Sequence, residues 1–239
     1  MEIEKTINYK GVDINIYQDN DATSPREYND LSSMICFHSR YNLGDKHDYS
    51  DPEEFIWQLA DIDYDSGEHE NKTSEELNEL AWKILNERKE FAILPLYLYD
   101  HSGITMNTSG FSCGWDSGQV GWIYTNKTML DVMGISPEDR TNEKLEMYLK
   151  SDVEFYDQFI TGQVYWYKIE DGEGSCGGFF GTDWRNNGLL EHAENDIDCY
   201  LERKDTKYKE SLQRHYDLVK TYIKRKIPII YREPNLITY

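Results

Sequence analysis

The longest apolar stretch of the sequence runs from Phe91 to Tyr99 and contains Pro95. A membrane-spanning helix needs about 20 apolar residues, so this stretch is too short to cross a bilayer. Its length fits a buried β-strand. Pro95 predicts that this strand lies at an edge of its sheet or at a bulge, because proline cannot donate a ladder hydrogen bond.

Two helices have clear start signals. Asp51 caps a helix that has proline at its first position and acidic residues in its first turn, and we expect this helix to run to about Asp61. Thr73 and Glu76 form a capping box ahead of apolar residues at helical spacing. Apolar periodicity predicts further helices at 126–133, 142–159 and 189–226.

Short β-branched and aromatic segments predict the strands. Two hairpins are expected, one joining 3–9 to 12–17 and one joining 163–170 to 176–180 around Asp171-Gly172, with single strands at 34–37, 91–99 and 119–124. Residues 103–118 are expected to be a connection rich in Gly, Ser and Thr. The pattern predicts an α+β fold with a mixed or antiparallel sheet, flanking helices and a helical C-terminal segment.

We expect one domain over 1–239, because the sequence shows neither an internal repeat nor a Pro/Gly/Ser linker. A sheet-containing body would span 1–185, and a helical C-terminal extension would span 186–239.

The charge is strongly negative and unevenly distributed. Residues 1–199 carry 40 acidic and 15 basic side chains, whereas residues 200–239 carry 5 acidic and 10 basic ones, which gives a net charge of −20. Phosphate binding depends on neutralising cations, so direct nucleic-acid binding by the acidic body is not expected. The acidity could serve solubility alone, or it could imitate a polyanion such as DNA.

Four scattered cysteines and an N-terminus without an apolar signal core predict a cytoplasmic protein that does not associate with membranes. The cysteines are Cys36, Cys113, Cys176 and Cys199. Gly172 to Gly177 matches the glycine spacing of a dinucleotide-binding turn, but it leads into Gly-Phe-Phe-Gly and contains Glu173, so a glycine-rich hairpin is favoured. No cofactor is expected.

The first polar segment that could carry chemistry surrounds the short strand at 34–37. It supplies two cations, two carboxylates and two imidazoles, namely Arg26, Asp30, His38, Arg40, Asp45 and His47. Arg26, His38 and Arg40 are candidate ligand-binding residues, because arginine can hold an anionic group through two hydrogen bonds. The same groups could instead form ion-paired turns around a buried strand. A metal site of His38, Asp45 and His47 is disfavoured by its spacing.

Two further polar segments follow predicted strands. Asp100 and His101 come after the strand at 91–99, and Cys113, Trp115, Asp116 and Gln119 lie within or just after the small-residue connection. His101, Asp116, Asp100 and Cys113 are candidate catalytic residues, as a Cys-His-Asp arrangement or as a carboxylate pair. Trp115 and Gln119 are candidate ligand-binding residues, and the indole of Trp115 would stack on the base of a nucleotide-like ligand. A buried, inert cysteine is the simpler alternative for Cys113.

Four segments of the sequence, taken together, carry a resemblance to a known group of proteins. They are SPREYNDLSSMICFHSRYNLGD, LPLYLYDHSGITMNTSGFSCGWDSGQVGWIY, EFYDQFITGQVYWYKIED and GGFFG. Together, over roughly positions 14 to 181, they resemble a widespread group of uncharacterised phage and mobile-element proteins, with Trp115 to Gly121 as the most specific part. Leu31-Ser-Ser33 stands where that group has Leu-Gly-Thr, and Gly114 stands where it has Pro; neither departure removes a charged group.

The resemblance implies a phage or mobile-element origin rather than an activity, and phages carry small accessory proteins, many of them acidic, that counter host defences or redirect host enzymes. Combined with the acidity, it predicts binding and inhibition of a host component, and the expected component is a bacterial defence protein with a basic surface. The alternative is a nucleotide-like ligand-binding protein or hydrolase that uses the Arg, His and Asp candidates on a small anionic ligand. The oligomeric state is left open by the sequence.

Overall fold

The computed structural model describes residues 2–63, 72–170 and 174–226, and the chain divides into two compact units. The terminal unit combines Met1–Asp19 with Val164–Tyr239, and the central unit is Asn20–Gln163. This division differs from the expected boundary at 185, because the N-terminal strands belong with the C-terminal part. Whether the two units fold as one domain stays a prediction.

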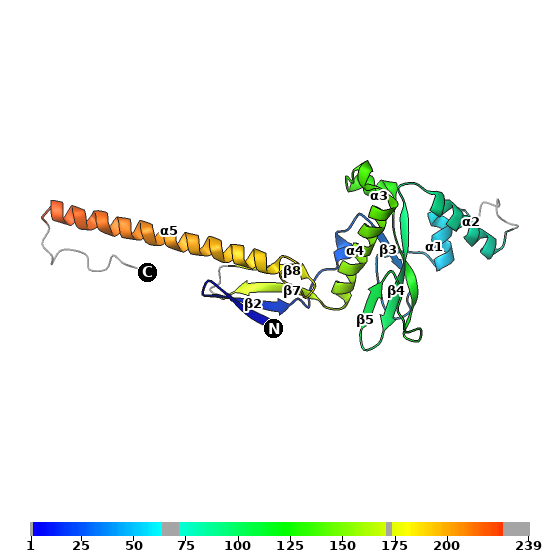
Figure 1. Ribbon diagram of the computed structural model, residues 1–239, viewed down its shortest axis with the longest axis horizontal. Helices are drawn as coiled ribbons and strands as arrows, with labels where there is room; N and C mark the ends of the chain where they lie inside the picture. Colours follow the sequence, from blue (N-terminus) through cyan, green and yellow to red (C-terminus); the bar gives the residue numbers. More distant parts are fainter. Residues whose placement is uncertain (1, 64–71, 171–173, 227–239) are drawn as a thin grey trace. The chain divides into compact units, whose positions relative to one another are not determined.

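The terminal unit is a four-stranded antiparallel sheet in the order β1-β2-β7-β8 with one long helix on it (Figure 1). Its elements are β1 (Lys5–Tyr9), β2 (Val12–Gln18), β7 (Val164–Ile169), β8 (Ser175–Phe180) and α5 (Leu189–Lys224). Both expected hairpins are confirmed by the pairing of β1 with β2 and of β7 with β8. The expected turn at Asp171-Gly172 lies outside the described residues.

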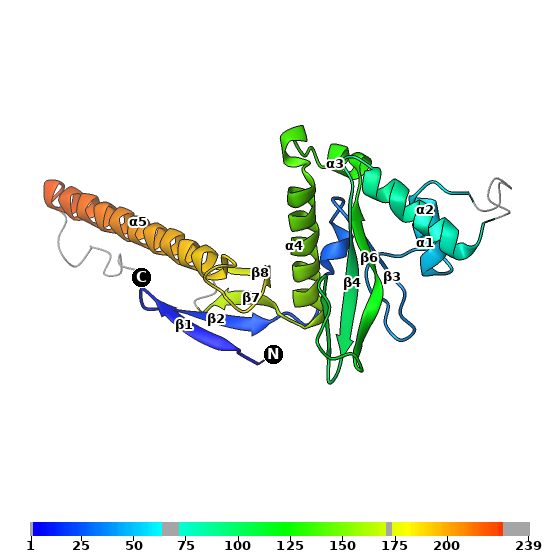
Figure 2. The same ribbon diagram turned by 45° about the vertical axis from the view of Figure 1, so that its right-hand side comes forward.

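The central unit has three layers around a second antiparallel sheet in the order β3-β6-β4-β5. Figure 2 shows α4 on one face of this sheet and the pair α1 and α2 on the other. The strands are β3 (Ser33–Cys36), β4 (Ala92–Asp100), β5 (Ile104–Asn107) and β6 (Ser117–Thr125). The helices are α1 (Pro52–Leu59), α2 (Ser74–Glu87), α3 (Lys127–Val132) and α4 (Asn142–Ile160), with short 3-10 turns at Pro25–Glu27 and Pro137–Asp139.

The α+β class and the marked helix starts are confirmed. The Asp51 side chain accepts a hydrogen bond from the Glu54 backbone N–H at 2.9 Å. Thr73 and Glu76 form the expected capping box at the start of α2, which satisfies two backbone donors that no helical carbonyl can reach. No helix among the described residues is both long and apolar enough to cross a membrane.

Three details differ from expectation. The connection at 103–118 contains a strand, β5, whose four residues ITMN are too few to show a β pattern. Strand β4 is internal to the sheet, but β5 pairs only with Tyr97–Asp100, so Pro95 lies where β4 has a single partner strand, β6, and the bulge follows directly after Leu96. The apolar spacing of 142–159 predicts that Phe155 shares a face with Leu149 and Tyr156, but Phe155 of α4 is 48% exposed whereas the other two are buried.

Gly121 sets how closely the two central-unit strands β3 and β6 approach each other. It lies opposite Cys36, and a Cβ atom at this position would lie 1.9 Å from the Ile35 carbonyl oxygen. That atom belongs to the backbone, so it can move only if β3 moves. Gly118, in the same strand, has no atom within 4 Å of the corresponding Cβ position.

We therefore expect Gly121→Ala to lower the free energy of unfolding by about 3 kcal/mol or more, because the added methyl group pushes β3 away from β6. Gly118→Ala is the matched control, since it adds the same group to the same strand in open space. Urea denaturation of both variants measures the difference. Equal stabilities of the two variants would contradict the close strand approach.

Candidate functional site

Three loops of the central unit meet at one end of its sheet. They are the segment after β3, the tight turn between β4 and β5, and the loop from 108 to 116 that precedes β6. The Asp100 backbone N–H donates to the Asp116 carbonyl oxygen at 2.8 Å, which joins the second loop to the third. We call this end of the sheet the hairpin tip. It brings together most of the candidate residues of the sequence.

The cation of the hairpin tip already has a carboxylate partner. Arg40 forms an ion pair with Asp100, whose other carboxylate oxygen accepts a hydrogen bond from the Tyr41 hydroxyl at 3.3 Å. The side chain of Arg40 is 68% exposed, so water screens this pair strongly. Binding an anionic ligand would require Arg40 to leave Asp100 or to be shared with it.

Asp116 lies between His101 and Cys113. Its Oδ2 is 3.4 Å from His101 Nδ1 and 3.9 Å from Cys113 Sγ. A cysteine nucleophile needs the imidazole as its direct partner, with the carboxylate behind the imidazole. Here the thiol instead donates to the carboxylate, so the contacts do not form the order of groups that the Cys-His-Asp hypothesis requires.

The two carboxylates also do not act as a pair. Asp100 binds Arg40 and Tyr41, while Asp116 contacts His101 and Cys113. Carboxylates that share a proton must contact each other, so these separate partners do not support the carboxylate-pair hypothesis.

The third loop is held in shape although its tip is exposed. The Asn107 side chain accepts hydrogen bonds from the backbone N–H groups of Ser109 and Gly110, at 3.1 and 2.7 Å, and donates to the Gly110 carbonyl. Ser117 donates to the Cys113 carbonyl, and the Tyr99 and Phe111 rings lie 5.5 Å apart. Trp115 is nevertheless 97% exposed. The loop therefore presents an indole to solvent from a fixed backbone.

Arg26 is placed elsewhere. Its guanidinium donates two hydrogen bonds to Asp45, at 2.8 and 2.7 Å, and two more to Ser32, and its side chain is only 5% exposed. Asp45 also accepts from the Met34 N–H, which lies at the level of Ile123 in β6. Ile123 is six positions along β6 from Ser117 at the hairpin tip, or about 20 Å of strand.

The ion-paired alternative thus describes Arg26 and Asp45. Ser32 continues the network by donating to Asp152 of α4 at 2.7 Å, so Arg26 connects the loop before β3 to this helix. These contacts are structural, and they leave Arg26 apart from Arg40. A ligand held by both arginines is not supported by this geometry.

The remaining candidates lie around these two groups. His38 borders the hairpin tip, where its Nδ1 accepts the N–H groups of Arg40 and Tyr41 and its ring stacks on Tyr41. Gln119 donates to the Gly121 carbonyl within β6. His47 bonds to the Cys36 carbonyl through Nε2 at 3.0 Å. Across the described ranges, no group of three or more His, Cys, Asp or Glu side chains is placed to hold a metal ion.

The glycine-rich segment after β7 leads into strand β8, as the hairpin interpretation predicts. A dinucleotide-binding turn would lead into a helix whose N-terminus meets the phosphates. Gly172 and Glu173 themselves lie outside the described residues.

One polar cluster was missed by the sequence analysis. In the terminal unit, the buried Tyr167 hydroxyl lies 2.8 Å from His192 Nδ1 and donates to Asp196 at 2.6 Å. Burial, together with the Asp196 hydrogen bond, raises the pKa of Tyr167. His192 and Asp196 are four residues apart on α5, a spacing that places both on one helix face and could have signalled the cluster. Its contacts satisfy a buried hydroxyl, which is a structural role.

Searches against protein-family models, curated proteins and solved structures find no match to this chain. The resemblance to phage and mobile-element proteins therefore stays a prediction, and the function must be argued from the geometry.

The two Arg–Asp pairs should differ sharply in their effect on stability. Arg26→Ala should lower the free energy of unfolding by about 3–5 kcal/mol, because it leaves the carboxylate of Asp45 without its cation. Arg40→Ala, the matched control at an exposed pair, should cost less than about 1 kcal/mol. Urea denaturation measures both values. A small loss for Arg26→Ala would show that Arg26 is free for another role.

Proposed function

We propose that this chain is a non-catalytic binding protein, which recognises a basic partner protein through the carboxylate-rich surface of its central unit, with Trp115 as the anchoring contact. The observation that carries the proposal is the exposure of Trp115 on an ordered loop of a strongly acidic unit.

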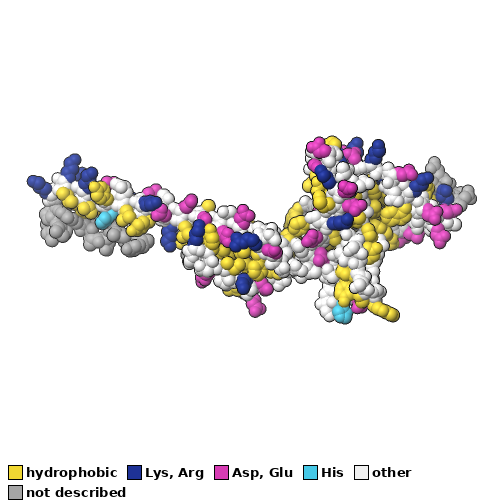
Figure 3. All heavy atoms as spheres, in the orientation of Figure 1, with side chains coloured by type: hydrophobic (Ala, Val, Ile, Leu, Met, Phe, Trp, Pro, Cys, Tyr) yellow, Lys and Arg dark blue, Asp and Glu magenta, His cyan; other side chains and the backbone are white. Residues whose placement is uncertain are grey.

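The negative charge belongs almost entirely to the central unit. Residues 20–163 contain 28 Asp and Glu against 11 Lys and Arg, whereas the terminal unit has 17 against 14. Within the central unit, residues 51–79 alone carry 11 acidic side chains and one basic one. Figure 3 shows Asp and Glu side chains on the surface of α1 and α2. Such a surface attracts cationic partners and accelerates their association.

Several of these carboxylates already have a local partner. Asp51 and Glu76 cap their helices, and Asp61 pairs with Arg88 at 2.7 Å. Glu54 accepts hydrogen bonds from Ser50, and Glu53 accepts one from Asn78 at 3.3 Å. The side chains of Glu53, Glu75 and Glu79 are exposed on α1 and α2. Exposed carboxylates on rigid helices keep a fixed spacing. This arrangement supports recognition of a regular array of cations rather than solubility alone.

Trp115 supplies the apolar contact that charge cannot provide. Tryptophan is enriched among the residues that contribute most to protein–protein binding, because it buries a large rigid surface at a small entropic cost. The hydrogen bonds of Asn107 and Ser117 fix the loop before any partner arrives. A preorganised loop loses less entropy on binding.

The exposure of the hairpin tip favours binding over catalysis. His101 is 63% exposed and Arg40 is 68% exposed. Catalytic electrostatics depends on a site that excludes water. The order of contacts around Asp116 and the separation of Arg26 from Arg40 point the same way.

The partner class is proposed from the sequence. Resemblance to phage and mobile-element proteins, together with a DNA-like excess of negative charge, favours a bacterial defence protein with a nucleic-acid-binding surface as the partner. The chain would then act as an inhibitor in the host cytoplasm by occupying that surface.

The proposal predicts salt-sensitive capture that depends on Trp115. The tagged chain should retain a stoichiometric protein from bacterial lysate at low salt and release it as the ionic strength rises to about 0.5 M, where charge attraction is screened. Trp115→Ala should weaken this capture by about tenfold or more. Tyr28→Ala is the matched control, because it removes another exposed aromatic ring of the central unit.

Native mass spectrometry of the eluted material separates the alternatives. Binding that persists unchanged in high salt would contradict recognition by charge. A bound small anion without a protein partner would favour the ligand-binding alternative instead, and equal losses in the Trp115 and Tyr28 variants would remove the anchoring role of Trp115.

A further inference from the structure

An apolar stripe runs along the second half of α5. Tyr208, Leu212, Tyr216, Val219 and Ile223 follow one another at intervals of three or four residues, which places them on one face of the helix. These five side chains are between 37% and 65% exposed. Hydrophobic side chains along this part of α5 and basic ones at its end are visible in Figure 3.

In the first half of α5, the apolar face of the helix is buried. All buried residues of the helix lie there, namely Leu189, Leu190, Ala193 and Ile197, and they pack against strands β2 and β7 of the terminal unit. Leu201 is the last residue that packs against this core. The stripe thus continues the apolar face of α5 beyond the core that covers its beginning.

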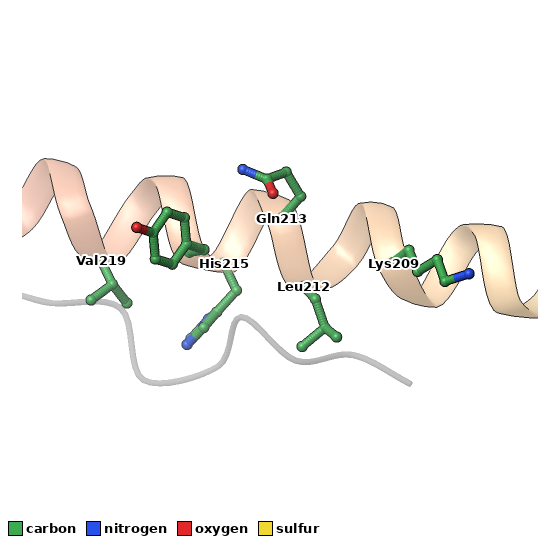
Figure 4. A pocket seen from close by; sticks show the side chains of 6 residues that line it. Lys209, Leu212, Gln213, His215 and Val219 are labelled. Carbon is green, nitrogen blue, oxygen red and sulfur yellow. The ribbon is translucent and has the colours of Figure 1, made fainter.

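A helix of this kind gains most of its stability by burying its apolar face. Figure 4 shows Leu212, His215 and Val219 on the same side of α5, where they help to line a hollow along the helix. Lys209, Gln213 and Tyr216 complete its lining. The lining therefore combines the apolar side chains of Leu212, Tyr216 and Val219 with polar ones, and a mixture of apolar and polar side chains is typical of protein interfaces.

We propose that this stripe pairs antiparallel with the same stripe of a second copy of the chain. The spacing of four of the five stripe residues is symmetric about a point between His215 and Tyr216, so Tyr216 would lie level with His215 of the second copy. In an antiparallel pair centred there, Tyr208 lies level with Ile223 of the second copy, and Leu212 lies level with Val219. Apolar side chains then meet over about 24 Å of helix.

The charges at the two ends of the stripe favour this orientation. The same symmetry brings Asp205 of α5 level with the turn that follows α5 in the second copy, where Lys226 supplies a cation, so opposite charges meet at both ends of the contact. Residues 189–206 carry six acidic and two basic side chains, and residues 207–226 carry two acidic and seven basic ones. A parallel pair would instead align the basic end of α5 with itself.

Asp205 already contacts Lys209 of its own helix at 2.6 Å. Both side chains are more than half exposed, so this contact contributes little stability and can be exchanged for one with Lys226. The pairing needs no residue of the hairpin tip, and it is independent of the function proposed above.

Sedimentation equilibrium of the full chain tests the proposal. Between about 1 and 100 µM the mass should rise from 28.2 kDa toward twice that value. Leu212→Glu should raise the dissociation constant by about 100-fold, because a symmetric pair contains the change twice. Thr221→Glu is the matched control, since its position faces away from the stripe and it should leave the mass unchanged.

A charge swap tests the orientation. Asp205→Lys and Lys226→Glu should each weaken the pair severalfold, and the double variant should restore it, because the exchanged charges again meet. Failure of the double variant to recover would overturn the antiparallel arrangement. A single-chain mass at every concentration, or a dimer that Leu212→Glu leaves intact, would overturn the pairing itself. If the chain stays a monomer and Leu212 is nevertheless shielded from solvent, residues 227–239 of the same chain would be the occupant of the stripe.

Discussion

The pairing of β2 with β7 is the constraint on which the terminal unit depends. It joins the first strands of the chain to a strand that follows 144 residues of central unit, and the Asp19 N–H donates to the Val164 carbonyl at 2.8 Å where the central unit begins and ends. Closing a flexible loop of this length costs about 4 kcal/mol and a constant. Asn20 and Gln163 both belong to the compact central unit, so the contacts of that unit also hold the two ends of this loop and offset part of the cost.

That core leaves functional groups at the ends of strands rather than between layers. Helices α1 and α2 cover one face of the central sheet and α4 covers the other, so the aromatic and aliphatic side chains of β4 and β6 are used for packing. Arg26, Ser32 and Asp152 join the loop before β3 to α4. The hairpin tip lies beyond these layers, where hydrogen bonds hold the backbone of its loop while side chains such as Trp115 are open to water. This openness is the reason why recognition rather than chemistry is proposed for it.

Acidic and basic side chains are concentrated in different parts of the chain. The central unit carries the acidic excess, while the second half of α5 is basic and apolar. Two surfaces of opposite character in one chain can serve two partners without competing. If α5 pairs with its own copy, the dimer carries two copies of the acidic surface. A partner with two basic sites would then meet the second acidic surface at a raised effective concentration.

Local signals in the sequence were sufficient for most elements. Some signals depend only on neighbours within a few residues, so the sequence by itself is enough to detect them. They are the caps at Asp51 and Thr73, the apolar periodicity of α4 and α5, and the residue pattern of β1, β2 and β7. The four residues of β5 are too few to show a β pattern. Strand β4 tolerates Pro95 inside the sheet because β5 pairs only with Tyr97–Asp100 and leaves the part of β4 that contains Pro95 without a second partner strand. Among the site candidates, the sequence indicated that Asp100, His101, Cys113 and Asp116 belong together, but it also grouped Arg26 with Arg40. Only the tertiary structure separated the two arginines, placed Asp116 between thiol and imidazole, and joined β2 to β7, because these contacts depend on strand order and register between residues far apart in the chain.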